Sequence, residues 1–178
     1  MSDAITLRLD DAEVIARLNQ IAEQVGNMTP AMQAIGEILT ESTKHRFDTS
    51  TDPEGKRWAP NAPATVLARI AQISGAYSPK TGKLTKKGAT VAMNKKPLVA
   101  TGMEQDSIRY QVRPDGMGVE IGTNRFAGEW SGGAAVHQFG REDGSIPARA
   151  FLGISAEDRI GVLDVLNLFL EQSTGAKG

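Results

Sequence analysis

The chain has 178 residues, 40% of them hydrophobic and 23% charged, which predicts a water-soluble globular protein with one hydrophobic core. Its formal net charge of −1 argues against a general attraction of the whole molecule to nucleic acid or to an anionic membrane. The absence of cysteine excludes disulfides, thiolate nucleophiles and thiolate metal sites.

The N-terminal part of the chain predicts one strand and two helices. Residues 4–10 alternate apolar and polar side chains, as a half-buried strand does. The helix that follows ends at Gly26-Asn27, and Thr29-Pro30 begins another that ends near Phe47. Their short connection indicates an antiparallel pair. The apolar stripes of the two helices are Val14, Ile15, Leu18, Ile21 and Val25, and then Met32, Ile35, Ile38 and Leu39.

Residues 48–63 predict a loop, because three prolines and one glycine interrupt any regular pattern there. The large indole of Trp58 is costly to leave in water, so we expect it to hold this loop against the core. A short helix is expected over residues 63–73. Its expected inward-facing residues are Val66, Leu67 and Ile70.

The next segment, at about residues 75–97, is predicted to be a flexible insertion within a single domain that spans residues 1–178. It holds six lysines and no acidic residue, among scattered glycine, serine and threonine. Three interpretations stay open: a solvated loop, a contact with an acidic neighbouring protein or subunit, or a nonspecific approach to DNA. Tyr77 is its only aromatic residue, which argues against sequence-specific or single-strand recognition. The lysines are Lys80, Lys83, Lys86, Lys87, Lys95 and Lys96.

The C-terminal part predicts a β-hairpin and a last helix. Residues 108–112 and 119–121 alternate, and Pro114-Asp115-Gly116 between them supplies a turn. A helical turn is expected within residues 134–138. Ser155 and Asp158 predict a capping box for the last helix, whose expected apolar face holds Ile160, Leu163, Leu166 and Leu170. The sum is an α+β fold: a small, mostly antiparallel β-sheet packed by an N-terminal helical pair and a C-terminal helix, with long loops.

The residues that usually carry catalysis do not form a recognisable set. His45 and His137 are the only histidines, and neither has the neighbours of a metal site. The chain has neither a nucleophile-elbow serine nor a glycine loop that leads into a phosphate-binding helix. We therefore predict that the chain is not an enzyme and uses no cofactor or metal. A small hydrolase based on His137 and Glu129 is the least favoured alternative, since His137 is expected to pack or to contact a neighbouring subunit.

Six short motifs follow one another along essentially the whole chain. Each is weak alone, but six in this order form a specific pattern. They are Arg46-Phe47, Asp52-Pro53-Glu54-Gly55-Lys56-Arg57-Trp58, Leu98-Val99-Ala100-Thr101-Gly102 leading to Ser107-Ile108, Gly122-Thr123-Asn124, His137-Gln138-Phe139-Gly140, and Ile146-Pro147-Ala148-Arg149-Ala150-Phe151-Leu152-Gly153. This series resembles the phage virion morphogenesis family, the tail-completion proteins of Mu-like phages and their relatives.

The resemblance implies a structural role in phage assembly. Such a protein completes or terminates the tail and helps to form the head–tail junction, as an oligomeric ring at the head-proximal end of the tail tube. The implied partners are further copies of the chain, with a hexamer suspected from tail-tube symmetry, and the tail tube and head–tail connector proteins. A connector or neck component that contacts DNA nonspecifically is the alternative.

The expected location follows from the same role. No apolar run approaches the roughly 20 residues that a membrane-spanning helix needs, and the N-terminus lacks the layout of a signal peptide. We expect no membrane partner, assembly in the host cytoplasm, and a final place in the tail or neck of the virion.

Two sets of residues are predicted to serve this role. Structural anchors are Phe47, Asp52, Pro53, Gly55, Trp58, Pro147, Arg149, Phe151 and Leu152. Within this set, Arg149, Phe151 and Leu152 are expected to dock the last helix on the sheet, although Arg149 could equally bridge to a neighbour. Candidate interface residues are Lys80, Lys83, Lys86, Lys87, Lys95, Lys96, Trp130, His137 and Phe139. An unpaired sheet edge is a further place where the next subunit could bind.

Overall fold

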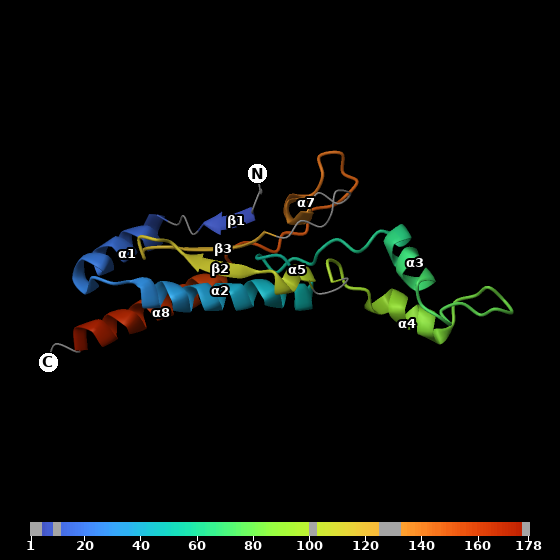
Figure 1. Ribbon diagram of the computed structural model, residues 1–178, viewed down its shortest axis with the longest axis horizontal. Helices are drawn as coiled ribbons and strands as arrows, with labels where there is room; N and C mark the ends of the chain where they lie inside the picture. Colours follow the sequence, from blue (N-terminus) through green and yellow to red (C-terminus); the bar gives the residue numbers. More distant parts are fainter. Residues whose placement is uncertain (1–4, 9–11, 100–102, 125–132, 176–178) are drawn as a thin grey trace.

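The computed structural model describes residues 5–8, 12–99, 103–124 and 133–175. It has the predicted α+β fold: a three-stranded antiparallel sheet lies on two long helices, and a helical arm extends from one end (Figure 1). The elements in chain order are β1 (Ile5–Arg8), α1 (Ala12–Val25), α2 (Thr29–Thr49), α3 (Pro63–Ala71), α4 (Lys86–Asn94), α5 (Met103–Asp106), β2 (Arg109–Val112), β3 (Val119–Thr123), α7 (Gly133–Phe139) and α8 (Ala156–Gly175).

The sheet has the strand order β1-β3-β2, with both pairs antiparallel. Strands β2 and β3 form the predicted hairpin, in which Val112 lies opposite Val119. Its turn is held where Met117 donates its backbone N–H to Asp115 Oδ1 at 2.9 Å, and Gly116 has the positive φ of 69° that glycine adopts without strain. The N-terminal strand β1 pairs with β3, so the sheet joins the N-terminal segment to the C-terminal half of the chain.

One face of the sheet packs on α2. Val119 and Ile121 of β3 are buried in the same cluster as Met32 and Ile35 of α2. The alternate residues of β3 are only half-buried, as expected for a strand with one covered face. Each such aliphatic side chain contributes about 1.5 to 3 kcal/mol when it is buried. This contact therefore supplies much of the energy that holds the sheet on the helix.

Helix α8 packs along α2 with a face that was predicted only in part: Leu166 is buried and Leu170 packs against the core as expected. Asp158, Val162 and Leu166 are buried, whereas Ile160 and Leu163, which were expected in the core, are 61% and 44% exposed. Apolar residues occur on all sides of α8, so the 3.6-residue period does not single out one face. The buried carboxylate of Asp158, which the apolar pattern ignores, lies on the inner face instead.

The N-terminal helical pair is present as predicted, but not all of its predicted core residues are buried. Helices α1 and α2 follow one another across a short link, but the main helix contact of α2 is with α8. Ile15 and Ile38, both predicted core residues, are 36% and 38% exposed. Val14 and Leu18 are buried as expected. The side chains of Ile21 and Val25 lie outside the described residues.

Residues 61–97 form the arm, which extends away from the sheet and the long helices (Figure 1). Helix α3 packs on α4, and Ile70 is buried between the arm's elements as predicted, but Leu67 is 53% exposed. Helix α4 was not predicted, because its lysines and glycine are typical of a loop. Its first turn is capped by the Thr85 hydroxyl, which accepts the Gly88 N–H group. Gly88 permits the close packing, since a Cβ there would lie 2.4 Å from the carbonyl oxygen of Ala76.

Gly36 allows β2 to approach α2 closely. A Cβ at this position would lie 2.3 Å from Cδ2 of Tyr110, so the aromatic ring rests on the helix backbone. Replacing Gly36 by Ala should destabilise the protein by about 1 to 3 kcal/mol, because the methyl group overpacks this contact. In a Tyr110→Ala background the same change should be neutral or stabilising by up to about 1 kcal/mol, since alanine favours the helix.

Urea unfolding of the four proteins in this cycle measures the coupling. The same cost of Gly36→Ala in both backgrounds would show that the Tyr110 ring does not set the requirement for glycine.

Candidate functional site

Three aromatic rings join three of the six sequence motifs: Arg46-Phe47, the loop of residues 52–58 and the segment of residues 146–153. Phe47 and Phe151 are fully buried with ring centroids 5.2 Å apart, and Trp58 meets Phe47 edge-on at 5.4 Å. The indole Nε1 of Trp58 donates to the carbonyl oxygen of Ala150 at 2.9 Å. The indole is therefore buried with its polar atom satisfied, as a large amphipathic side chain requires. The rings connect the end of α2, the loop that follows it, and the segment before α8.

The loop of residues 51–58 is built by its own motif. Asp52 Oδ1 accepts the backbone N–H of Lys56 at 2.7 Å, and Gly55 has a positive φ of 79°. Pro53 is buried against Gly153, where a Cβ would lie 2.2 Å from Pro53 Cγ. The aspartate, proline and glycine thus shape the loop and seat it on the segment of residues 146–153.

Arg46 joins α2 to α8 and to the segment of residues 146–153, although it was not among the predicted anchors. Its guanidinium donates to the carbonyl oxygens of Phe151 at 2.8 Å and Gly153 at 2.9 Å, and to Asp158 Oδ2 at 2.5 Å. Burial lowers the pKa of Arg46, and the nearby Asp158 carboxylate opposes that shift. The ion pair is almost completely buried. Arg46 directly precedes Phe47, a predicted anchor, and this position was the sequence signal that could have identified it as an anchor too.

Asp158 also begins α8. Its carboxylate accepts the backbone N–H of Ser155 at 2.8 Å, and the Ser155 hydroxyl accepts the backbone N–H of Asp158 at 3.0 Å. This is the predicted capping box, with aspartate in the position usually taken by glutamate. One carboxylate therefore caps α8 and neutralises Arg46.

Arg149 and Gln138 hold the remaining backbone of this region. Arg149 donates to the carbonyl oxygens of Ala59 and Pro60, both at 2.8 Å, so it secures the exit of the first loop and does not join α8 to the sheet as predicted. Burial lowers its pKa. Gln138, which sequence reasoning missed, accepts the Phe151 and Leu152 N–H groups at 3.0 and 2.9 Å.

Two other predicted anchors lie in different settings. Leu152 is buried in the core cluster, and Gln138 Nε2 donates to its carbonyl oxygen at 2.9 Å. Pro147 is exposed, so its role is confined to the shape of its own loop. A polar side chain such as Gln138 inside a short motif could have been recognised as a backbone partner, because loops without strand pairing need one.

The two histidines lie in different settings. His137 Nδ1 lies 2.9 Å from both carboxylate oxygens of Glu104, and His45 is exposed on α2. Glu129, the partner suggested for a hydrolase, lies outside the described residues. Among described residues, no group of three or more histidine, cysteine, aspartate or glutamate side chains could hold a metal ion.

The six candidate lysines of the arm fall into two groups. Lys87, Lys95 and Lys96 donate to the carbonyl oxygens of Ser74, Val99 and Asp48, at 2.8, 2.8 and 2.7 Å. Burial lowers the pKa of Lys95, and the positive charge of Arg69 lowers it further. These three lysines brace the arm. The exposed lysines whose side chains make no hydrogen bond or ion pair within the described ranges are Lys80, Lys83 and Lys86.

The other candidate interface residues are dispersed. Phe139, at the end of α7, is 72% exposed, and the neighbouring His137 is half-buried. Trp130 lies outside the described residues. The arm and α7 are thus two separate places where side chains suited to a partner reach the surface.

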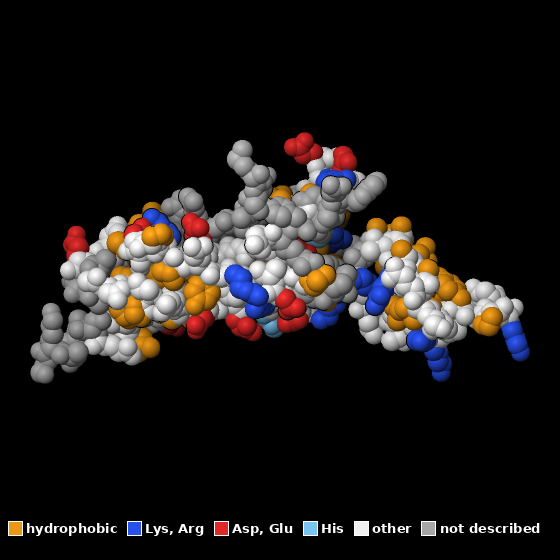
Figure 2. Space-filling model, in the orientation of Figure 1, with side chains coloured by type: hydrophobic (Ala, Val, Ile, Leu, Met, Phe, Trp, Pro, Cys, Tyr) orange, Lys and Arg blue, Asp and Glu red, His pale blue; other side chains and the backbone are white. Residues whose placement is uncertain are grey.

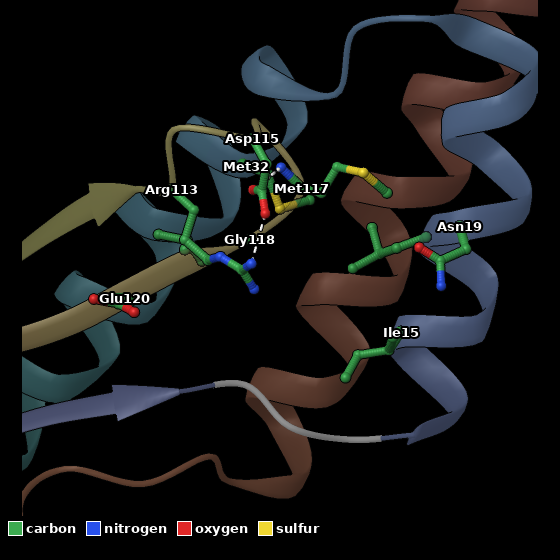
Figure 3. Close-up of a pocket in the computed structure, with 10 residues that line it drawn as sticks. Ile15, Asn19, Met32, Arg113, Asp115, Met117, Gly118 and Glu120 are labelled. Carbon is green, nitrogen blue, oxygen red and sulfur yellow. Dashed lines mark hydrogen bonds and ion pairs between the residues drawn. The ribbon is translucent and has the colours of Figure 1, made fainter.

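A pocket of about 450 Å³ lies between α1 and the β2–β3 turn (Figure 3), at the end of the molecule opposite the arm (Figure 1). Arg113 and Asp115 form an exposed ion pair at 2.5 Å on its turn side, and Ile15 and Asn19 face it from α1 (Figure 3). Among the described residues, the lining of this pocket mixes apolar and charged side chains and includes no histidine, serine or threonine. This recess has room for a side chain of a neighbouring molecule.

A model of the phage virion morphogenesis family matches residues 9–171. The chain belongs to this family. The match covers both anchored loops, the arm and most of α8, so the family assignment includes every surface described above. The searches of curated proteins and of solved structures found no match. None of the helices in the described part of this family member is long and apolar enough to cross a membrane.

Trp58→Ala should destabilise the protein by about 3 to 5 kcal/mol, because a buried indole is removed from between Phe47 and the Ala150 carbonyl group. Trp58→Phe should cost less, since it keeps an aromatic ring and loses the hydrogen bond. Chemical denaturation of each variant provides the comparison. A wild-type melting temperature for Trp58→Ala would show that the indole does not anchor the loop.

Arg46→Met should destabilise the protein by about 3 to 5 kcal/mol, because it leaves the buried Asp158 carboxylate without its cation. Adding Asp158→Asn should recover part of that loss, since the amide carries no charge while its oxygen can still accept the Ser155 N–H group. Unfolding free energies of both single variants and the double variant test this coupling. Strictly additive costs would contradict a direct interaction.

Proposed function

We propose that this member of the phage virion morphogenesis family completes or terminates the phage tail and helps to form the head–tail junction. Membership of the family gives the chain a role in building the virion. In the proposal, several copies form a ring at the head-proximal end of the tail tube, with six copies favoured to match the symmetry of the tube.

The observation that carries the proposal is the asymmetry of the molecule. A compact body, held by the Phe47, Trp58 and Phe151 cluster, continues into an arm of different composition (Figure 1). A ring needs a heterologous contact, in which one patch of a subunit binds a different patch of the next. A body with a projecting arm supplies two such unlike patches, which supports closure by rotation.

The proposed role also defines partners and place. A tail-completing ring contacts the tail tube protein on one side and head–tail connector proteins on the other. We propose assembly in the host cytoplasm and retention in the tail or neck of the virion. The function proposed here is structural, without catalysis or a cofactor, and is supported by membership of the family and by the solvent-facing arm.

A second candidate function is a neck component that contacts DNA nonspecifically. The exposed Lys80, Lys83 and Lys86 favour it, because phosphate contacts need only clustered positive charge. Electrostatic DNA binding weakens steeply as salt rises. DNA binding by the purified protein that falls steeply between low and physiological salt would favour this candidate, and undetectable binding at low salt would remove it.

Changing Lys80, Lys83 and Lys86 together to Gln should reduce the yield of complete particles while leaving the melting temperature unchanged. The three side chains are exposed, so their loss affects contacts between proteins more than the fold. The measurement is infectious-particle yield from a host that supplies only the variant protein. Electron microscopy of the products should show tails without heads or tails of abnormal length.

A control on the remainder of the chain changes Lys44, Lys56 and Arg57 to Gln, which removes the same three positive charges and should leave the yield at the wild-type level. Normal yield from the arm variant would contradict a role for these lysines in assembly. Light scattering of the purified protein over a concentration series is the companion measurement. A closed ring in solution supports the proposal directly, whereas a monomer would mean that the tail tube or the head serves as the template.

A further inference from the structure

The arm has an unusual charge. Residues 61–97 contain Arg69 and six lysines but neither aspartate nor glutamate. Because the whole chain has a formal net charge of −1 and the arm carries +7, the rest of the chain carries −8. The small net charge of the protein thus conceals two oppositely charged parts. Opposite charge on two parts of one chain favours contact between copies.

The arm also exposes apolar side chains. Met93 is 86% exposed, Leu67 is 53% exposed and Leu84 is 46% exposed. Figure 2 shows hydrophobic side chains gathered over the arm, with lysine and arginine side chains along its lower edge and at its tip. Exposed leucine and methionine beside positive charge, on an element that buries little else, are typical of a surface that binds a partner.

The outer face of α8 has the complementary character. Ile160, Leu163 and Leu168 are 61%, 44% and 56% exposed. Helical spacing places Glu157 and Asp164, both exposed, on the same side as Ile160. Arg159 is the only basic residue in this helix of 20 residues. The outer face therefore combines apolar side chains with negative charge, as the arm combines them with positive charge.

The apolar part of this face continues onto α2. Ile38 is 38% exposed, and a Cβ on Gly161 of α8 would lie 3.6 Å from Ile38 Cγ2. Glu37 and Glu41 of α2 are exposed beside it. We define the α8 outer face as Glu157, Ile160, Leu163, Asp164 and Leu168, with Ile38 at its edge.

An arm cannot reach the α8 outer face of its own copy. Helix α8 lies under the sheet and runs toward the end of the body that is farthest from α3 and α4 (Figure 1). A contact between the two surfaces must therefore join two molecules. It is heterologous, because the arm of one copy meets α8 of another and leaves that second copy's arm available for a third.

We propose that the basic, apolar arm of one copy binds the acidic, apolar outer face of α8 on the next copy. This contact rests on the proposed ring and specifies the surfaces that build it. Met93, Leu67 and Leu84 bury apolar area against Ile160, Leu163 and Leu168, which provides most of the affinity. The lysines facing Glu157 and Asp164 orient the approach and disfavour the reverse arrangement, because like charges would then meet.

A charge-reversal experiment tests the contact. Lys80, Lys83 and Lys86 are changed to Glu in one protein, and Glu157 and Asp164 are changed to Lys in another. Each variant alone should lower particle yield by about tenfold or more, because like charges now face each other across the contact. A chain with all five changes should return to within about threefold of wild type, since attraction is restored with its sign reversed.

Control variants separate this contact from a general effect of charge. Glu54→Lys with Glu142→Lys makes the same charge change on exposed body positions outside α8. When it is combined with the Lys80, Lys83 and Lys86 reversal, it should give no recovery. Melting temperatures of all variants exclude unfolding as the cause. A failure of the five-change chain to recover, or an equal recovery with the control pair, overturns the proposed contact.

Crosslinking in assembled particles gives an independent readout, because the chain has no cysteine of its own. Met93→Cys in one copy and Ile160→Cys in another should be joined by a flexible bis-maleimide, whereas Met93→Cys with Glu142→Cys should not. Intact particles without the first product overturn the contact but leave the tail-completion role standing. If the protein is missing from the head-proximal end of the tail, the proposed function itself fails.

Discussion

The buried ion pair between Arg46 and Asp158 is the interaction on which the rest of this structure depends. Its guanidinium also donates to the carbonyl oxygens of Phe151 and Gly153, so one side chain fixes α2, α8 and the segment before α8. A buried pair of this kind adds little net stability, but a shifted helix would leave its charges unsatisfied at high cost. It therefore selects one rotation of α8 among several that its apolar residues alone would permit.

That selection explains which parts of the fold could be predicted from the sequence. The hairpin and the capping box were predictable because turn and cap residues act locally, at Gly116 and at Ser155. The inner face of α8 could be predicted only in part. Leu163 and Leu166 are equally hydrophobic, and it is the ion pair of Asp158 with the distant Arg46 that turns Leu166 into the core and leaves Leu163 exposed. Helix α4 was missed for a different reason, since its lysines and Gly88 gave the segment the composition of a loop.

The candidate site shows the same division. Trp58 and the Pro53 loop could be recognised as core contacts from composition. The particular backbone groups that Arg149 and Gln138 bind could not be predicted. Those groups are backbone carbonyl and N–H groups, which nearly every residue carries, so the sequence does not show which of them will be bound. The lysines illustrate the limit of composition in another way: Lys96 reaches Asp48, while Lys83 remains in solvent. Whether a lysine of the arm reaches a carbonyl oxygen or stays in solvent depends on the three-dimensional course of the backbone, which composition does not show.

The contact of Pro53 with Gly153 has an evolutionary consequence. These residues come from loops 100 positions apart, yet a single added carbon at Gly153 would overlap the proline ring. Gly153 cannot gain a side chain while Pro53 keeps its ring, so a change to a smaller residue at position 53 must precede or accompany a larger residue at position 153. Across the family the two sites should vary as a pair: a relative with a side chain at the position of Gly153 should have a residue smaller than proline at that of Pro53.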